Sequence, residues 1–204
     1  MNLPSRRPTR AVSSRRTSVV LGACLFFLLL GIFALGYAGF VFADSHIYQA
    51  VEINKLERAS LPSKPRILAE GDAIGELQVP RLSLTAIVVQ GDSPSSLRRA
   101  VGHISKSPLP GEWGNVALAG HRDTFFRPLQ GIRLGDEIVF KTPEHSFEYL
   151  VESIEVVAPN DVQVLEPSSG HDLTFITCFP FYFVGPAPKR FVVRAREVDP
   201  MPHE

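Results

Sequence analysis

A run of 24 residues without a charged side chain, Val19 to Phe42, constrains most strongly how this chain of 204 residues can fold. A helix needs about 20 apolar residues to cross the hydrocarbon core of a bilayer, so the run is long enough to span a membrane. Five arginines and no acidic residue precede it, and basic residues favour the cytoplasmic side of a membrane. The sequence therefore predicts a cytoplasmic basic tail over 1–18, a transmembrane anchor over 19–42 and an extracytoplasmic remainder.

A cleaved signal peptide is the competing interpretation of the same segment. The apolar region of a signal peptide usually has about 7 to 15 residues, which is shorter than this run. Val41-Phe42-Ala43 nevertheless resembles a cleavage site. We favour the uncleaved anchor because of its length, with cleavage after Ala43 as the alternative.

The distribution of charge excludes one class of partner. The chain has 21 basic and 21 acidic side chains, and five of the basic ones lie in residues 1–18. The remainder therefore has a net charge of −5. Because nucleic-acid binding requires a basic surface that meets phosphates, we expect no nucleic-acid partner.

The part that follows the anchor divides into a stem and a folded domain. Residues 43–70 are predicted to form a stem and linker, in which the two prolines of SLPSKP, residues 60–65, favour extended backbone. From about Leu68 onward the pattern changes to short β-prone runs separated by turn residues. The predicted folded domain spans 71–204.

This domain is predicted to be all-β. The candidate strands are IGELQV, TAIVVQ, NVALAGH, DEIVFKT, SFEYLVESIEVVA, LTFITC and RFVVRAREV. Only Ser93 to Val101 has the pattern of a short helix, with serine and proline at its start. Seven or eight short strands with few helices indicate an antiparallel sandwich or barrel, and about 135 residues suffice for one such core.

Cys178 is the first candidate for chemistry. The other cysteine, Cys24, lies within the predicted anchor, so the two cannot form a disulfide. A lone extracytoplasmic cysteine is either a buried apolar residue or a free reactive thiol. A thiol attacks as the thiolate and has an ordinary pKa of about 8.5, so a reactive one needs a base or a cation beside it.

The candidate base is His121, which ends the predicted strand NVALAG behind Gly120. His103 is its only rival. His145 falls in a predicted hairpin turn, and His171 lies at the opposite end of the cysteine strand, too far away at about 3.3 Å per residue.

The candidate cation is Arg190. If RFVVRAREV pairs antiparallel with LTFITC, Arg190 lies near Cys178. An arginine in that position can stabilise the oxyanion that forms when a thiolate attacks a carbonyl. The alternative is an ordinary surface ion pair with an acidic side chain.

Three motifs resemble those of the sortase family. Thr174-Phe175-Ile176-Thr177-Cys178 resembles the sortase signature Thr-Leu-x-Thr-Cys, with Phe175 where leucine is usual. The segment Leu118 to Arg122 resembles the sortase histidine segment, and Pro186 to Val193 resembles the segment with the sortase arginine. The resemblance runs from about Ile74 to Arg196 and is strongest to class D sortases.

The resemblance implies an eight-stranded sortase-type β-barrel with short helices, preceded by the transmembrane helix. It implies a transpeptidase that cleaves a Leu-Pro-x-Thr-Gly-like sorting motif between threonine and glycine. Cys178 would be the nucleophile that forms a thioacyl intermediate. His121 would be the acid–base group, and Arg190 would hold the oxyanion.

The candidate substrate contacts are Thr177, Val116, Leu118 and Phe183. Thr177 either orients the substrate or is a strand residue with a satisfied hydroxyl. Val116, Leu118 and Phe183 are candidates for the walls of an apolar groove that takes the leucine and proline of the motif.

The expected partners are secreted proteins with a carboxy-terminal sorting signal, an amine acceptor on the cell surface and the membrane. The reaction requires no cofactor and no metal. Calcium is a further option, because Asp161 and Glu166 lie in the loop before the cysteine strand and such loops bind calcium in some sortases. Two acidic residues in a loop are, however, more often simply solvated.

Two other functions compete with the sortase hypothesis. An L,D-transpeptidase also uses an extracytoplasmic cysteine and histidine, but its signature has glycine and histidine close before the cysteine, which Phe175-Ile176-Thr177 does not match. The other is a catalytically inert, membrane-anchored β-domain that binds a protein partner. The complete set of His121, Cys178 and Arg190 argues against it.

The charge pattern predicts the topology. We expect a reporter enzyme fused after Glu204 to be active only when it requires an extracytoplasmic location, because the arginines retain the amino terminus in the cytoplasm. Paired fusions of a periplasm-type and a cytoplasm-type reporter measure this. Activity of the cytoplasm-type reporter would contradict the assignment.

Overall fold

The structure, a computed structural model, describes residues 13–58 and 68–198. The three arginines nearest the amino terminus and the predicted SLPSKP linker lie outside the described residues. The chain divides into two compact units, Met1–Asp44 and Ser45–Glu204, and each is considered by itself.

Helix α1 (Ser13–Arg58) begins in the first unit, where it contains the uncharged run, and ends in the second. Every side chain from Val20 to Phe42 is exposed, including Phe33 at 74% and Leu35 at 75%. Among the helices in the described ranges, only α1 is long and apolar enough to cross a membrane. Exposed apolar side chains along a helix of this length are compatible with a helix that lipid surrounds.

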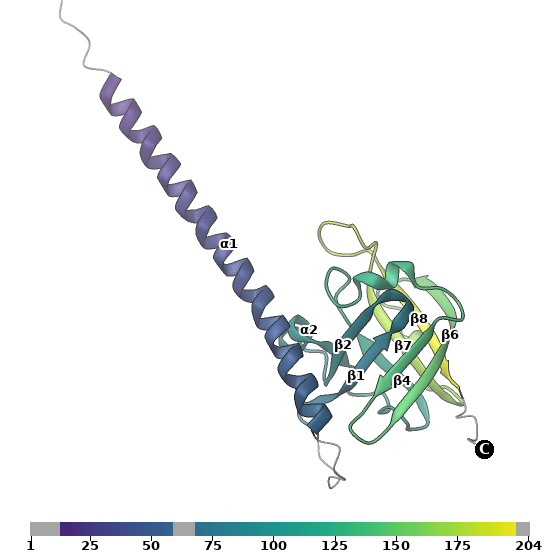
Figure 1. Cartoon of the computed structure of the whole chain (residues 1–204). Helices are drawn as coiled ribbons and strands as arrows, with labels where there is room; N and C mark the ends of the chain where they lie inside the picture. Colours follow the sequence, from purple (N-terminus) through teal and green to yellow (C-terminus); the bar gives the residue numbers. More distant parts are fainter. Residues whose placement is uncertain (1–12, 59–67, 199–204) are drawn as a thin grey trace, which may run out of the picture. The chain divides into compact units, whose positions relative to one another are not determined.

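The second unit contains a closed barrel of eight strands in the order β1-β2-β3-β4-β7-β8-β6-β5 (Figure 1). The strands are β1 (Ala73–Val79), β2 (Leu84–Gln90), β3 (Val101–His103), β4 (Gly114–Ala119), β5 (Glu137–Lys141), β6 (Ser146–Val157), β7 (His171–Phe179) and β8 (Lys189–Glu197). The connections contain the short helix α2 (Pro94–Arg99) and the 3-10 turns η1 (Pro80–Leu82), η2 (Arg127–Gly131) and η3 (Gln163–Leu165). The prediction of an all-β, eight-stranded barrel with short helices is confirmed.

Two features of the barrel differ from the sequence-based expectation. Strand β3 has three residues, too few for an alternating pattern to reveal it. The pairs β2–β3 and β4–β7 are parallel, whereas an all-antiparallel sheet was expected. Parallel neighbours require a crossover connection, and the one between β2 and β3 contains α2.

The core fills the inside of the barrel with alternate residues of each strand. Leu77, Val88, Leu118, Phe175 and Val193 come from five different strands, and each is at most 1% exposed. Burial of such a side chain contributes about 1.5–3 kcal/mol, so this layer supplies much of the barrel's stability. The residues between them in sequence point outward, and these outward positions are the ones available to a substrate.

A second, smaller apolar cluster lies on the outside of β2. Ile87, Val89 and Ala100 are at most 1% exposed there, and Tyr48 and Ile53 of α1 pack against them. Strand β2 is therefore covered on both faces, which explains why its sequence LTAIVVQ is almost continuously apolar. The stem residues from Ser45 onward thus belong to the same compact unit as the barrel.

Hydrogen bonds complete this contact. The side-chain amide of Gln49 donates to the carbonyl of Arg99 at 2.6 Å and accepts from the N–H of Ile87 at 2.7 Å. The hydroxyl of Tyr48 donates to the carbonyl of Gly71 at 3.2 Å. The Gln49 amide therefore satisfies two backbone groups at once.

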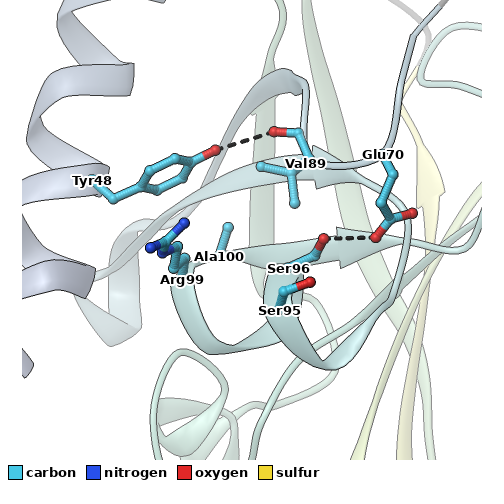
Figure 2. Close-up of a pocket in the computed structure, with 8 residues that line it drawn as sticks. Tyr48, Glu70, Val89, Ser95, Ser96, Arg99 and Ala100 are labelled. Carbon is cyan, nitrogen blue, oxygen red and sulfur yellow. Dashed lines mark hydrogen bonds between the residues drawn. The ribbon is translucent and has the colours of Figure 1, made fainter. Parts of the chain in front are cut away.

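A polar hollow of about 230 Å³ lies beside the contact (Figure 2). Its wall includes Glu70, which accepts a hydrogen bond from the hydroxyl of Ser96 at 2.7 Å. This bond and those from Ser93 lower the pKa of Glu70 from its ordinary value. Glu70 therefore connects the start of the barrel to α2.

The contacts of Gln49 predict a stability effect. We expect Gln49→Ala to lower the free energy of unfolding of the second unit by about 1–3 kcal/mol, because two backbone groups lose their partner. Ile47→Ala is the control, since Ile47 lies on the same helix and is 64% exposed, and it should change stability by at most about 0.5 kcal/mol. Denaturant unfolding of the full chain in detergent measures both. Equal effects of the two substitutions would contradict the structural role of Gln49.

Candidate active site

Cys178 and Arg190 are paired across β7 and β8. The two strands are antiparallel, and Cys178 lies directly opposite Arg190. Side chains of directly opposed residues project from the same face of a sheet. The expectation from sequence that these two residues are neighbours is confirmed at the level of strand register.

The segment that leads to His121 lies along the other edge of β7. Strand β4 runs parallel to β7, and Ala119, two residues before His121, pairs with Ile176, two residues before Cys178. The N–H of Gly120 donates to the carbonyl of Ile176 at 3.2 Å, and the hydroxyl of Thr177 donates to the carbonyl of Gly120 at 2.7 Å. These two bonds extend the contact between the segments beyond the end of β4.

The turn after β4 depends on a close approach at Gly120. A Cβ atom at this position would lie 2.7 Å from the ring of Phe126, so only glycine fits without displacing the ring. Phe126 is fully buried, and its N–H donates to the carbonyl of His121 at 3.1 Å. The glycine and the phenylalanine together fix where the backbone of His121 lies.

Three of the candidate substrate contacts have side chains that are buried in the barrel or already hydrogen-bonded to the backbone. Val116 and Leu118 are 1% and 0% exposed and belong to the barrel core. Their placement departs from the expectation that they wall a groove, because the alternation of β4 turns Ala117 and Ala119 outward instead. Thr177 is 3% exposed with its hydroxyl bonded to Gly120, so it acts as a link between β7 and the histidine segment.

The outer face of β4 and β7 forms the surface around the cysteine. Ala119, Ile176 and Cys178 are partly exposed there, and Cys178 is a free thiol. Ile176 could have been identified from the sequence, because it precedes Cys178 by two residues and so shares its face. Ala119 could not, because the register of β4 is needed to place it.

The loop between β6 and β7 is held on the same side of the sheet. The side-chain amide of Asn115 donates to the carbonyls of Val164 at 3.1 Å and Glu166 at 3.3 Å, and Arg194 donates to Val164 at 3.4 Å. The hydroxyl of Thr174 in turn donates to the Asn115 side chain at 2.6 Å. The sequence motifs gave no signal for Asn115, whose contribution comes from contacts with a distant loop.

The loop between β7 and β8 leaves the barrel next to the paired cysteine and arginine (Figure 1). At its base, the rings of Phe179 and Phe191 stack with centroids 6.1 Å apart, and Phe181 meets Phe191 edge-on at 5.2 Å. Phe183, the fourth candidate substrate contact, lies farther out on this loop and is 43% exposed. It is the one candidate wall residue with an accessible side chain.

Three other histidines of the barrel lie away from this face. His103 is 1% exposed and points into the barrel, where its ring contacts Gln90 at 2.9 Å and the Pro108 carbonyl at 2.8 Å. His145 is exposed in the β5–β6 hairpin, and His171 begins the strand that Cys178 nearly ends. His121 is therefore the histidine that follows the strand paired with the cysteine strand.

The two acidic residues considered for calcium have ordinary local roles. The Asp161 carboxylate accepts from the N–H of Gln163 at 3.2 Å, and the Glu166 backbone accepts from Asn115. Within residues 13–58 and 68–198, no group of three or more His, Cys, Asp and Glu side chains is arranged to hold a metal ion.

Comparisons with known proteins agree with this geometry. Residues 77–198 match the family model for the sortase domain. The chain is 27% identical to sortase D of Bacillus subtilis (strain 168), over 85% of this chain and 96% of the relative. It is 26% identical to sortase A of Bacillus anthracis, over 74% of this chain and 72% of the relative.

A solved structure has the same fold. The sortase D5 transpeptidase of Clostridium perfringens superposes with a TM-score of 0.67 at 23% identity, covering 74% of this chain and 99% of that structure.

The burial of His103 predicts a pH dependence of stability. Burial lowers the pKa of His103, and the Pro108 carbonyl, Glu112 and Asp92 oppose this only in part. An unfolded histidine has a pKa of about 6.5, so as pH falls the unfolded state takes up the proton first and stability is lost. We expect the free energy of unfolding to decrease from pH 7 to pH 5, and to decrease less in His103→Gln.

His145→Gln is the matched control, because His145 is exposed in a turn. Its unfolding free energy should keep the wild-type pH dependence. An unchanged pH dependence in His103→Gln would show that the buried ring is not the source.

Proposed function

Because the chain belongs to the sortase family, we propose that it is a membrane-anchored cysteine transpeptidase with its catalytic domain outside the cytoplasm. Sortases are generally transpeptidases that attach proteins to the cell wall. The observation that supports the proposal is that Cys178 lies directly opposite Arg190 on one side, while β4, the strand that leads to His121, pairs with β7 on the other.

In the first half of the proposed reaction, the Cys178 thiolate attacks the threonine carbonyl of a Leu-Pro-x-Thr-Gly-like sorting motif. A carbon–sulfur bond forms and the carbon–nitrogen bond to glycine breaks, which leaves a thioacyl intermediate. His121 gives its proton to the departing amine. Acid–base help of this kind is worth about 10²–10⁴-fold in rate.

In the second half, an amine on the cell surface attacks the thioester. His121 takes the proton from the amine, a new carbon–nitrogen bond forms and the thiolate leaves. The product joins the secreted protein to the acceptor. Each step needs only groups of the chain itself, so we propose a reaction without cofactor and without calcium.

Arg190 has the role of oxyanion stabiliser in both halves. Its Nη1 donates to the carbonyls of Lys189 at 3.1 Å and Ala187 at 3.4 Å, and the second of these bonds is long. The guanidinium is thus tied only to local backbone, and no acidic partner holds it among the residues that the structure describes. A change of side-chain rotamer can direct it to the oxyanion, where one such donor contributes about 10²–10³ in turnover.

The substrate motif is proposed to lie over the outer face of β4 and β7. Ala119 and Ile176 form its apolar floor beside Cys178, and the Asn115-bound loop between β6 and β7 forms one wall. Small and apolar side chains suit the leucine and proline of the motif, which offer no charge to pair.

The nucleophile provides the decisive test. We expect Cys178→Ala to abolish both cleavage and amine transfer for a motif found in a peptide library, while thermal unfolding stays close to that of the wild type. Cys24→Ala is the control and should keep full activity, because Cys24 lies in the apolar helix. Mass spectrometry of the products measures both reactions. Turnover by Cys178→Ala near the wild-type rate would overturn the role of Cys178 as nucleophile. No turnover of any motif by the wild type would instead favour an inert β-domain that binds a partner.

A further inference from the structure

Arg122, the residue after His121, contacts the loop between β7 and β8. Its Nη2 donates to the carbonyl of Phe183 at 2.6 Å and to that of Gly185 at 3.2 Å. Its guanidinium also lies over the Phe183 ring, with Cζ 5.9 Å from the centroid. The Arg122 guanidinium therefore contacts both the backbone carbonyls of this loop and the side chain of Phe183.

The loop has little else to hold it in place. Residues 182–186 are all exposed, including Tyr182 at 74% and Val184 at 96%. Besides the bonds from Arg122, residues 182–186 make one hydrogen bond within the described part of the chain. The Phe183 N–H donates to the Pro180 carbonyl at 3.4 Å, which is long. Burial and local bonds thus contribute little, and Arg122 supplies the main restraint.

A second arginine assists in a weaker way. Arg127 in η2 lies over the ring of Tyr182, with Cζ 5.8 Å from the centroid. No carbonyl of the loop accepts a hydrogen bond from it in the described ranges. The two arginines can therefore be compared directly. Arg122 contacts a ring and two carbonyls of the loop, whereas Arg127 contacts a ring alone.

The contact joins the three candidate catalytic segments. The loop begins at Pro180, two residues after Cys178, and ends at Pro188, two residues before Arg190, while Arg122 follows His121 directly. Arg122 has no acidic partner among the described residues, and its Nη1 is buried without a hydrogen bond to the rest of them. Its guanidinium is therefore committed to this loop, with no competing ion pair.

We propose that Arg122 is a positioning residue that latches the β7–β8 loop to the histidine segment, and that the latched loop directs the thioacyl intermediate to amine rather than water. The inference rests on the proposed function. In both outcomes the carbon–sulfur bond of the thioester breaks and His121 takes a proton from the attacking group. An amine gives a carbon–nitrogen bond, and water gives a carbon–oxygen bond and a free acid.

The latch acts on this choice through the position of the reacting groups. The loop joins the ends of β7 and β8, where Cys178 and Arg190 lie opposite each other, so a held loop restrains both residues. With the loop released, this restraint on the attack geometry is lost. Misplacement of reacting groups by about 1 Å can cost up to about 10²-fold in rate, and attack by a bound, oriented amine depends on that geometry more than attack by water does.

The test compares Arg122→Gln with the wild type in the full chain in detergent. A motif peptide and triglycine as amine are supplied, and the amide and acid products are quantified together by mass spectrometry. We expect the ratio of transfer to hydrolysis to fall roughly tenfold, an effect within the range of such misplacement. Chymotrypsin should also cleave after Tyr182 or Phe183 faster than in the wild type, because the loop is released.

Two arginine controls set the scale. Arg127→Gln should lower the ratio less than Arg122→Gln, because it removes only a ring contact. Arg98→Gln removes the same charge from an exposed position on α2 and should leave the ratio and the proteolysis rate unchanged. If Arg122→Gln does not fold, Arg122→Lys replaces it, since lysine keeps the charge but not the planar group that lies over the ring.

An unchanged product ratio in the Arg122 variant overturns the proposal, whether or not total turnover falls, because a merely structural residue would lower both products alike. Unchanged chymotrypsin cleavage overturns the latch itself. Cys178→Ala in the same assay separates the two proposals. If the wild type forms both products and Cys178→Ala forms neither, the transpeptidase proposal stands and any failure belongs to Arg122 alone.

Discussion

The pairing of β7 with β4 on one edge and β8 on the other is the constraint on which the site depends. Cys178 lies on the middle strand, β7. Strand β8 therefore brings Arg190 opposite it, and β4 lies along the other edge of the same strand. The inner side of the same three strands contributes Leu118, Phe175 and Val193 to the core. The face with Cys178 is thus the reverse side of a buried part of the barrel core, where a displaced strand would open cavities.

The sequence predicted the elements that a pattern of neighbouring residues can indicate. The uncharged run, the strand pattern and the neighbouring positions of Cys178 and Arg190 follow from composition, alternation and antiparallel pairing. The parallel pairs could not be predicted in this way, because the contact of β4 with β7 joins residues about 57 positions apart. Alternation likewise shows that Val116 and Leu118 share a face, but only the register shows that this face is the interior.

The roles of Gln49 and Arg122 could not be predicted from the sequence, because both depend on contacts between distant segments. Gln49 lies in the predicted stem, and its contribution comes from hydrogen bonds to two backbone groups of the second unit. Arg122 lies within the histidine motif, yet its contacts are to carbonyls more than 60 residues away. The motif indicates candidate catalytic residues, and the three-dimensional contacts show which other residues hold the segments around them.

The order of strands in the closed barrel has a consequence for the chain during its synthesis and folding. Strand β8 is the last in sequence and pairs with both β6 and β7, so the barrel cannot shut until β8 has been made and has inserted. Until then Cys178 has no residue of β8 opposite it. In a chain synthesised from its amino terminus, Cys178 therefore acquires its neighbour Arg190 in the same event that closes the barrel, after the last strand has been made.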